Sequence, residues 1–354
     1  MTSLADVLAL VRVDSVSGNE AALASLVHER LRGNDALAVE RVGDNVIART
    51  FGHHATRVLV AGHLDTVPGD AGAAVIDGDV LRGLGASDMK GSLAAMLDLA
   101  LDPEPRPVEL TWVFYAREEI ERSRSGLVEV AELRPDLLVA DVAVLAEPTD
   151  GRVEAGCQGT LRVKVTLQGR RAHTARPFTG RNAIHRLGDV LAFVATYQPR
   201  EVDIDGVTFV EQLQAVGVEG GVAPNVVPDV ASCVLNHRVA PDRTRDEAVK
   251  WLRDYLGELL DDEDTLDVVD WAPSAPPELT NHHLTRLVAL TGESPRAKVG
   301  WTDVATFFEF GVPATNFGAG DPLLAHRSDE FVTASQVSRF ASILGEWLRT
   351  VSTG

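Results

Sequence analysis

Apolar and polar residues alternate along the first half of the chain in segments typical of helices and buried strands. Continuous apolar runs, which predict strands buried on both faces, lie at 58–61, 108–116 and 141–146. Apolar positions at helical spacing predict helices over 4–12, 19–32 and 89–99. Strands that alternate with helices predict a mainly parallel α/β sheet. In such sheets, ligands bind at the carboxyl ends of the strands.

Polar residues and glycines mark the ends of several segments. Asn19 is a candidate N-cap for the second helix, and Gly33-Asn34 ends it. Asp44-Asn45 predicts a turn between two short strands. Asp88, after a glycine-rich turn, is expected to open the helix over 89–99.

The pattern changes after Gly159. Residues 160–168 alternate apolar and polar side chains, as in an antiparallel strand with one exposed face. Further strands are predicted at 208–218 and 230–239, and helices at 182–197 and 246–260. We interpret this part as an α+β domain inserted into the α/β domain. The predicted domains are a first part at 1–159, the insertion at 160–276 and a second part at 277–354.

Composition and charge narrow the class of protein. The chain has 354 residues, and its net charge of -19 disfavours nucleic acid or an anionic membrane as partner. No apolar run approaches the roughly 20 residues that span a bilayer. The N-terminus has no basic region of a signal peptide, and the cysteines are only Cys157 and Cys233. We therefore expect a cytoplasmic protein with two unpaired thiols.

Candidate metal ligands follow the predicted strands. His63 and Asp65 stand two residues apart after the run 58–61, so Asp65 can hold one ring nitrogen of His63 and leave the other free for a metal ion. Mixed imidazole and carboxylate ligands suit zinc, and also cobalt or manganese. Five ligands suffice for two ions if one carboxylate bridges, and Asp88 is the best bridge because small residues precede it. The candidate ligands are His63, Asp88, Glu119, Glu147 and His326.

The adjacent pair Glu118-Glu119 is the clearest sign of catalysis. Adjacent side chains diverge, so one carboxylate can bind metal while the other faces a water. A glutamate beside such a water is the usual general base of metal-assisted hydrolysis. The residues alone leave the order of the two roles open.

Each candidate also has a purely structural interpretation. His63 and Asp65 could be a hydrogen-bonded pair, Asp88 a helix N-cap, and Glu118-Glu119 a solvated turn. A further alternative is a non-catalytic binding protein that a metal ion merely stabilises. The hydrolase hypothesis is favoured because all five ligands fall at predicted strand or loop ends of one sheet.

These motifs resemble the di-zinc aminoacylase/carboxypeptidase superfamily of metallopeptidases. The motifs, in order along the chain, are 62–68 (GHLDTVP), 83–91 with its core Asp-Met-Lys-Gly, Glu118-Glu119 and Glu147-Pro148. The resemblance implies two zinc ions, or Co²⁺ in their place. It also implies that Asp65 orients His63 and that Glu118 is the base, with His63 and Glu147 on one ion and Glu119 and His326 on the other.

The insertion resembles the lid and dimerisation domain of that superfamily. The motif 169–185 contains His173, which the resemblance implies reaches the active site of a partner subunit and stabilises an oxyanion. The segments 224–228 and 236–238 imply that Asn225 and Arg238 bind substrate. Arg176 and Thr302 are further candidate substrate contacts, and a homodimer is expected.

The likeness is closest to members that remove succinate from N-succinyl-LL-2,6-diaminopimelate, in lysine biosynthesis. It is carried by 154–159, 300–304 and 316–322. Better-known members of that group have arginine where Cys157 and Gln158 stand. Acetylornithine deacetylases, dipeptidases and aminoacylases share the metal motifs and are the alternatives.

Overall fold

The chain folds into two compact units in a computed structural model that describes residues 2–52, 54–70 and 73–351. The first unit is the chain up to Gly156, with Pro277–Ala297 and the part from Thr302 onward. The second unit is Cys157–Pro276 with Lys298–Trp301. The segment Lys298–Trp301 returns to the second unit, where the Gln158 N–H donates to the Lys298 carbonyl (3.2 Å). The sequence does not indicate this return.

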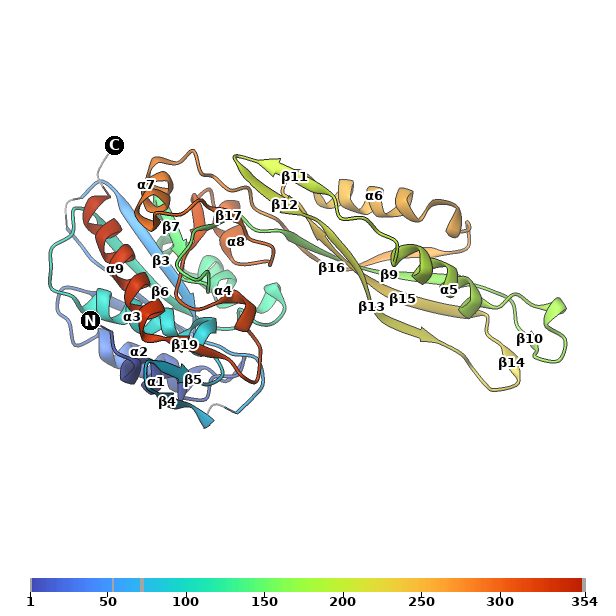
Figure 1. Cartoon of the computed structure of the whole chain (residues 1–354), viewed down its shortest axis with the longest axis horizontal. Coiled ribbons are helices and arrows are strands. Elements are labelled where there is room, and N and C mark those ends of the chain that lie inside the picture. Colours follow the sequence, from blue (N-terminus) through green and yellow to red (C-terminus); the bar gives the residue numbers. More distant parts are fainter. Residues whose placement is uncertain (1, 53, 71–72, 352–354) are drawn as a thin grey trace. The chain divides into compact units, whose positions relative to one another are not determined.

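In the described part of the first unit, eight strands form one sheet in the order β1-β2-β6-β3-β7-β18-β8-β17 (Figure 1). The central strands β6, β3, β7 and β18 are parallel, as the sequence predicts. Burial on both faces explains their continuous apolar runs. The bounds are β1 Ala38–Val42, β2 Asn45–Arg49, β3 Arg57–His63, β6 Glu109–Tyr115, β7 Val142–Leu145, β8 Glu154–Ala155, β17 Arg296–Ala297 and β18 Ala314–Asn316.

A small antiparallel sheet, β19-β5-β4, and a set of helices complete the first unit. The small strands are β4 Val75–Asp77, β5 Val80–Arg82 and β19 Phe331–Thr333. The helices are α1 Leu4–Val11, α2 Ala21–Leu31, α3 Gly91–Leu101, α4 Gly126–Leu133, α7 His282–Thr291, α8 Val304–Glu309 and α9 Ala334–Thr350. Single turns are η2 Ala86–Lys90, η3 Arg122–Arg124, η4 Pro135–Leu137 and η7 Pro322–Leu324.

The core of the first unit forms where helices cover the sheet. Val58 and Val60 of β3 share one apolar cluster with Leu93 of α3 and with Phe340 and Trp347 of α9. Burial of such side chains is the main favourable contribution to folding. Among the described residues, no helix is both long enough and apolar enough to cross a membrane.

The second unit is built on an antiparallel sheet in the order β13-β15-β9-β16 (Figure 1). Helices α5 and α6 pack on one face, against alternate residues of β9 such as Val163 and Val165. The strands are β9 Gly159–Gln168, β10 Ala172–His173, β11 Glu201–Ile204, β12 Val207–Val210, β13 Gln212–Gly220, β14 Val226–Val227, β15 Val230–Val239 and β16 Thr265–Ala272. The helices are α5 Ala183–Val194 and α6 Arg245–Leu256, with single turns η5 Pro177–Thr179 and η6 Gly257–Leu259.

Two predicted helix starts are wrong. Asn19 does not cap α2, because Glu20 takes the N-cap position and the Asn19 side chain instead donates to Asp14 (3.4 Å). Asp88 does not open α3, which starts at Gly91; it lies in the distorted turn η2 with φ -119° and ψ 91°. The position of Asp88 is set by a distant segment, because its N–H group donates to Glu330 (2.9 Å), whereas the contact of Asn19 is with a residue nearby in the sequence.

Two predicted elements are shorter or divided. The strand expected over 208–218 is split between β12 and β13 at Glu211. The reason is that the buried Glu211 carboxylate accepts from the Ala240 N–H (3.0 Å) and from Arg243 (2.9 Å). The helix expected over 246–260 ends at Leu256, and Gly257 with φ +46° starts the turn η6.

Candidate metal centre

Three of the predicted metal ligands follow neighbouring parallel strands. His63 is the last residue of β3, Glu119 follows β6, and Glu147 follows β7. Because β6, β3 and β7 are parallel neighbours, their carboxyl ends meet at one edge of the sheet. The topology therefore gathers these side chains where a ligand site of an α/β sheet is expected.

Asp88 lies between two histidines that come from distant parts of the chain. Its Oδ1 is 3.0 Å from His63 Nε2, and its Oδ2 is 3.6 Å from His326 Nε2. Each carboxylate oxygen thus faces a different imidazole. This arrangement suits a carboxylate that bridges two cations, one on each histidine.

Glu119 completes a compact set of ligand atoms. One ligand atom each of His63, Asp88 and Glu119 lie within 4.8 Å of one another. Glu119 Oε1 is also 2.8 Å from His326 Nε2. Glu147 is buried at the end of the neighbouring strand β7, and after burial its charge is the largest contribution that raises the pKa of Glu118. Imidazole and carboxylate donors at this spacing fit zinc and related divalent ions.

The electrostatics of the cluster show that it is poised for cations. Burial alone would lower the pKa of His63, but Asp65 and Asp88 outweigh it and raise the pKa well above its usual value. The hydrogen bond to Glu119 raises the pKa of His326 to about 9. The carboxylates thus favour positive charge at both rings, and a bound metal ion would take the place of a proton on each ring.

The general-base candidate Glu118 lies beside this cluster. Burial, followed by the nearby charge of Glu147, raises the pKa of Glu118 well above its usual value. Its backbone N–H is fixed by Asp65 Oδ1 (3.0 Å). A carboxyl group with a raised pKa beside a set of metal-ligand candidates is a candidate general base.

Asp65 acts differently from the simple pairing that the sequence suggests. His63 Nδ1 lies nearest the backbone carbonyl of Asp65 (3.0 Å) and 3.5 Å from the carboxylate. The fully buried carboxylate accepts from the backbone N–H groups of Glu118 and Glu119 (3.0 Å each) and from Ser17 Oγ (2.7 Å). Despite burial, the hydrogen bond with His63 and these contacts lower its pKa to about 2. Asp65 therefore holds both the histidine and the Glu118-Glu119 loop.

Two glycines allow the close approach of backbone at the site. A Cβ at Gly62 would lie 2.6 Å from Met89 Cε and 2.8 Å from Leu93 Cδ2, so these two side chains would have to shift to make room for a larger residue. Gly85 has φ +78°, where glycine is favoured, and starts η2. The peptide bond between Asp88 and Met89 is cis.

Two buried glutamates that support the site were missed by sequence reasoning. Glu330 accepts hydrogen bonds from three backbone N–H groups of the turn that carries Asp88. Glu20 accepts from the N–H groups of Gly18 (2.8 Å) and Arg117 (3.1 Å), just before Glu118. No sequence signal separates such residues from surface carboxylates, because their partners are backbone groups of remote loops.

The remaining predicted residues are mostly in the second unit. His173 ends β10, Arg176 precedes η5, and Asn225 lies before β14; all three are exposed. Arg238 is half-buried on β15, and its Nη1 donates to Thr160 Oγ1 (2.6 Å). Thr302 belongs to the first unit, where its buried Oγ1 donates to Asn316 Oδ1 (2.9 Å).

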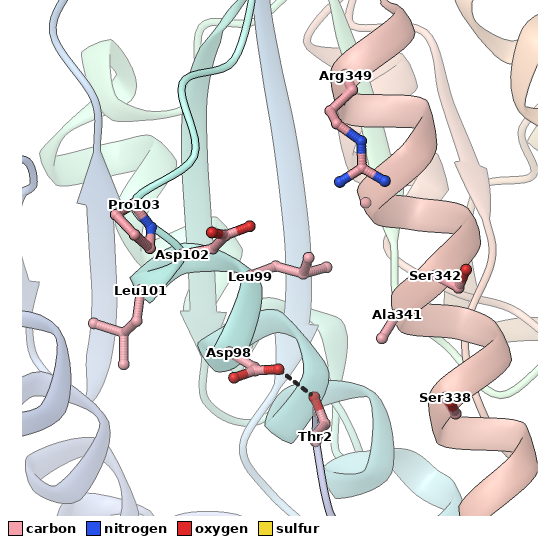
Figure 2. A pocket seen from close by; sticks show the side chains of 11 residues that line it. Thr2, Asp98, Leu99, Leu101, Asp102, Pro103, Ser338, Ala341, Ser342 and Arg349 are labelled. Carbon is pink, nitrogen blue, oxygen red and sulfur yellow. Dashed lines mark hydrogen bonds between the residues drawn. The ribbon is translucent and has the colours of Figure 1, made fainter.

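A cavity of about 580 Å³ lies between the end of α3 and α9, and Figure 2 shows its lining. Thr2 donates to Asp98 within it (3.0 Å), and Arg349 pairs with Glu104 (3.2 Å). None of its described lining residues is a predicted site residue. The candidate site is therefore identified by its chemistry rather than by a cavity.

Comparisons with known proteins agree with this chemistry. The profile of peptidase family M20/M25/M40 matches residues 59–350. The chain is 45% identical over 346 residues to "Putative succinyl-diaminopimelate desuccinylase DapE" of Mycobacterium tuberculosis, covering 96% of each chain. It is 42% identical to the succinyl-diaminopimelate desuccinylase of Corynebacterium glutamicum, covering 96% of this chain and 94% of that one.

Solved structures share the fold at low sequence identity. A tripeptidase from Staphylococcus aureus superposes with a TM-score of 0.79 at 21% identity, covering 98% of this chain and 96% of the other. Aminopeptidase PepT from Bacillus cereus gives 0.77 at 17% identity, covering 98% and 97%. At these identities the likeness concerns the fold alone.

Proposed function

This chain belongs to peptidase family M20/M25/M40 and is a metal-dependent hydrolase, and from that premise we propose that it hydrolyses N-succinyl-LL-2,6-diaminopimelate to succinate and LL-diaminopimelate. The observation that carries the hydrolytic part is Asp88, whose two oxygens face His63 and His326 beside Glu118. The substrate is supported by the relatives named above, which match over nearly the whole chain.

Two zinc ions are the proposed cofactors. His63 and Glu147 would hold one ion, Glu119 and His326 the other, and Asp88 would bridge them. The contact of 2.8 Å between His326 Nε2 and Glu119 Oε1 supports placing these two on one ion, and the contact of 3.0 Å between His63 Nε2 and Asp88 Oδ1 supports Asp88 as the bridge. When bound, such ions lower the pKa of a water and polarise an amide carbonyl.

Glu118 is the proposed general base and acid. It accepts the proton of the attacking water and returns it to the nitrogen of the departing amine. Asp65 fixes the backbone of the Glu118-Glu119 loop through both carboxylate oxygens, so the base and the ligand keep one geometry. With the loop held in this way, Glu119 would bind metal while Glu118 accepts and donates the proton.

His173 is proposed to stabilise the oxyanion. Its Nδ1 accepts the Ala175 N–H (3.0 Å), which leaves the proton of a neutral ring on Nε2. The exposed Nε2 is thus a hydrogen-bond donor, as an oxyanion requires. Arg176 and Asn225, equally exposed, are proposed to contact the substrate from the same unit.

Arg238 is the proposed anchor for a substrate carboxylate. Its guanidinium has no carboxylate partner among the described residues within ion-pair distance, and burial and Arg162 lower its pKa. A guanidinium in this state suits a carboxylate ligand and offsets the net negative charge of the protein. Thr302, whose hydroxyl donates to Asn316 Oδ1, is the remaining proposed substrate contact.

A homodimer is the proposed assembly, formed through the edge strand β13. Residues 212–218 of that strand carry no charge, and Val216 and Val218 are 58% and 59% exposed. The opposite edge strand β16 carries Asp267 and Asp270, which discourage pairing with another strand. The two edges thus differ in a way that favours self-association at β13.

The test is the rate of hydrolysis of N-succinyl-LL-2,6-diaminopimelate by zinc-loaded protein. We expect turnover in the wild type, with kcat reduced about 10²–10⁴-fold in Glu118→Gln at unchanged zinc content. If N-acetylornithine were hydrolysed faster than N-succinyl-LL-2,6-diaminopimelate, the protein would be assigned as a deacetylase instead. Equal rates in wild type and Glu118→Gln would contradict the role of the base.

A further inference from the structure

We infer that Glu330 is a positioning residue of the metal centre, which holds the turn bearing Asp88 in register with the segment bearing His326. This inference rests on the proposed metal site and adds a residue to which no role has been assigned. All of the groups involved belong to the first unit.

Glu330 is buried and makes a dense set of hydrogen bonds with one turn. The residue is 2% exposed. Its Oε1 accepts from the N–H groups of Ser87 (2.7 Å) and Asp88 (2.9 Å), and its Oε2 accepts from that of Gly85 (2.9 Å). A buried carboxylate normally needs a cation or several donors, and here three backbone donors fill that requirement.

The first N–H groups of the turn need an acceptor outside it, because the opening residues of any helical turn have no backbone acceptor within that turn. Residues 86–90 form η2, in which Asp88 and Met89 have non-helical dihedral angles. The N–H groups of Ser87 and Asp88 therefore point to Glu330, and buried donors without a partner would destabilise this conformation. The Asp88 side chain is attached to this same backbone. The hydrogen bond from the Asp88 N–H group to Glu330 therefore fixes the position from which the Asp88 carboxylate extends.

The same segment also carries His326. Glu330 lies four residues after His326, and Glu330 itself is anchored, because its carbonyl accepts the Gly83 N–H (3.0 Å) and β19 starts at the next residue. Strand β19 pairs with β5, which leads into the turn. One short segment thus sets the separation between the Asp88 and His326 ligand atoms.

The expected effect is on metal affinity and turnover together. Residues that orient metal ligands typically contribute 10–100-fold to metal affinity or activity. Glu330→Ala removes three acceptors, so we expect the zinc dissociation constant to rise about 10–100-fold. Glu330→Gln keeps one oxygen for Ser87 and Asp88, so a smaller rise is expected. We expect kcat at saturating zinc to fall while KM changes little.

The experiment is a zinc titration against a chromophoric chelator, with the visible absorption of the Co²⁺-loaded protein as a second readout. Asp329→Asn is the matched control, because the adjacent Asp329 is 59% exposed and pairs only with Arg327 in the described chain. Its zinc affinity should equal that of the wild type. A shifted Co²⁺ spectrum in Glu330→Ala, unchanged in Asp329→Asn, is the signature of moved ligands.

Two outcomes overturn the inference. Wild-type zinc affinity and Co²⁺ spectrum in both Glu330 variants would show that the residue supports folding alone. If Glu330→Ala does not fold, Glu330→Gln decides, since wild-type affinity in that variant also overturns the inference. A wild-type protein without zinc affinity would instead contradict the proposed metal site itself.

Discussion

At the residue scale, the candidate site contains carboxylates that hold backbone as well as carboxylates proposed to bind metal. Asp65, Glu20 and Glu330 are buried, and each accepts N–H groups of a loop that carries a ligand or the base. Such donors fix a buried carboxylate in one position, and the carboxylate in turn fixes the loop whose N–H groups it accepts. The proposed metal site therefore has two separate requirements: side chains that can bind metal, and carboxylates that hold the loops bearing those side chains in position.

Asp65 allows these two requirements to be tested. We expect Asp65→Asn to raise the zinc dissociation constant about 10–100-fold, because an amide cannot accept from both Glu118 and Glu119 N–H groups. Ser17→Ala removes only the hydroxyl donor to Asp65 and should change zinc affinity much less. Zinc titration of both variants provides the measurement. Equal zinc affinities of Asp65→Asn and Ser17→Ala would contradict the role of Asp65 in holding the Glu118-Glu119 loop.

The candidate ligands could be proposed from sequence for a physical reason. Ligands of an α/β sheet bind at the carboxyl ends of its strands, so His63, Glu119 and Glu147, which end or follow apolar strands, stand out from their surroundings. Glu330 does not stand out, because Asp329 beside it is equally acidic and the distinction arises only from tertiary packing. Supporting residues of this kind need a structure.

At the element scale, the inserted sheet is fastened to its helix by Asp264. This carboxylate accepts from Arg186 of α5 at both oxygens (2.8 and 2.6 Å) and from the backbone of Gln168 and Asp261 (2.7 Å each). Burial would raise its pKa, but Arg186 and these N–H groups lower it below 3.8. The start of β16, the end of β9 and α5 are thereby held together.

We expect Asp264→Asn to lower the free energy of unfolding by about 2 kcal/mol at pH 7. A carboxylate with a lowered folded-state pKa stabilises above its unfolded pKa, and this stability is lost as the pH falls through the folded value. The difference between wild type and variant should therefore be constant above about pH 5 and shrink below about pH 4.

Urea unfolding at several pH values measures this difference. Asp254→Asn is the control, because Asp254 forms an exposed pair with Lys250 (2.5 Å) on α6 and should change stability by no more than about 0.5 kcal/mol. A difference between Asp264→Asn and wild type that stays constant from pH 7 to pH 3 would contradict the ionic account.

The types of the elements could be predicted where burial leaves a pattern of apolar residues in the sequence. The residues at which the elements end could not be predicted in the same way. The parallel strands β3, β6 and β7 follow from continuous apolar runs. The break at Glu211 depends on a hydrogen bond from the Ala240 N–H group to the Glu211 carboxylate. The non-helical conformation of Asp88 depends on a hydrogen bond from its N–H group to Glu330. Local pattern contains the period of an element but not the partner that ends it.

At the scale of the whole molecule, the proposed dimer concerns which edge of the inserted sheet is free to pair. Both edge strands contain a bulge with an exposed valine, Val216 in β13 and Val269 in β16. Only β16 is flanked by aspartates that oppose pairing with another strand. The two valines are 58% and 60% exposed, so they form a matched pair for substitution.

We expect Val216→Lys to weaken the dimer by tenfold or more, about 1.4 kcal/mol, because two like charges would face each other across the paired edges. Val269→Lys should leave the dimer unchanged. Sedimentation velocity over a range of concentrations distinguishes the two. If His173 serves the site of the partner subunit, kcat of Val216→Lys should fall on dilution together with the dimer fraction. A variant that becomes monomeric yet keeps full kcat would refute that placement of His173 and leave the metal centre of each chain sufficient for catalysis.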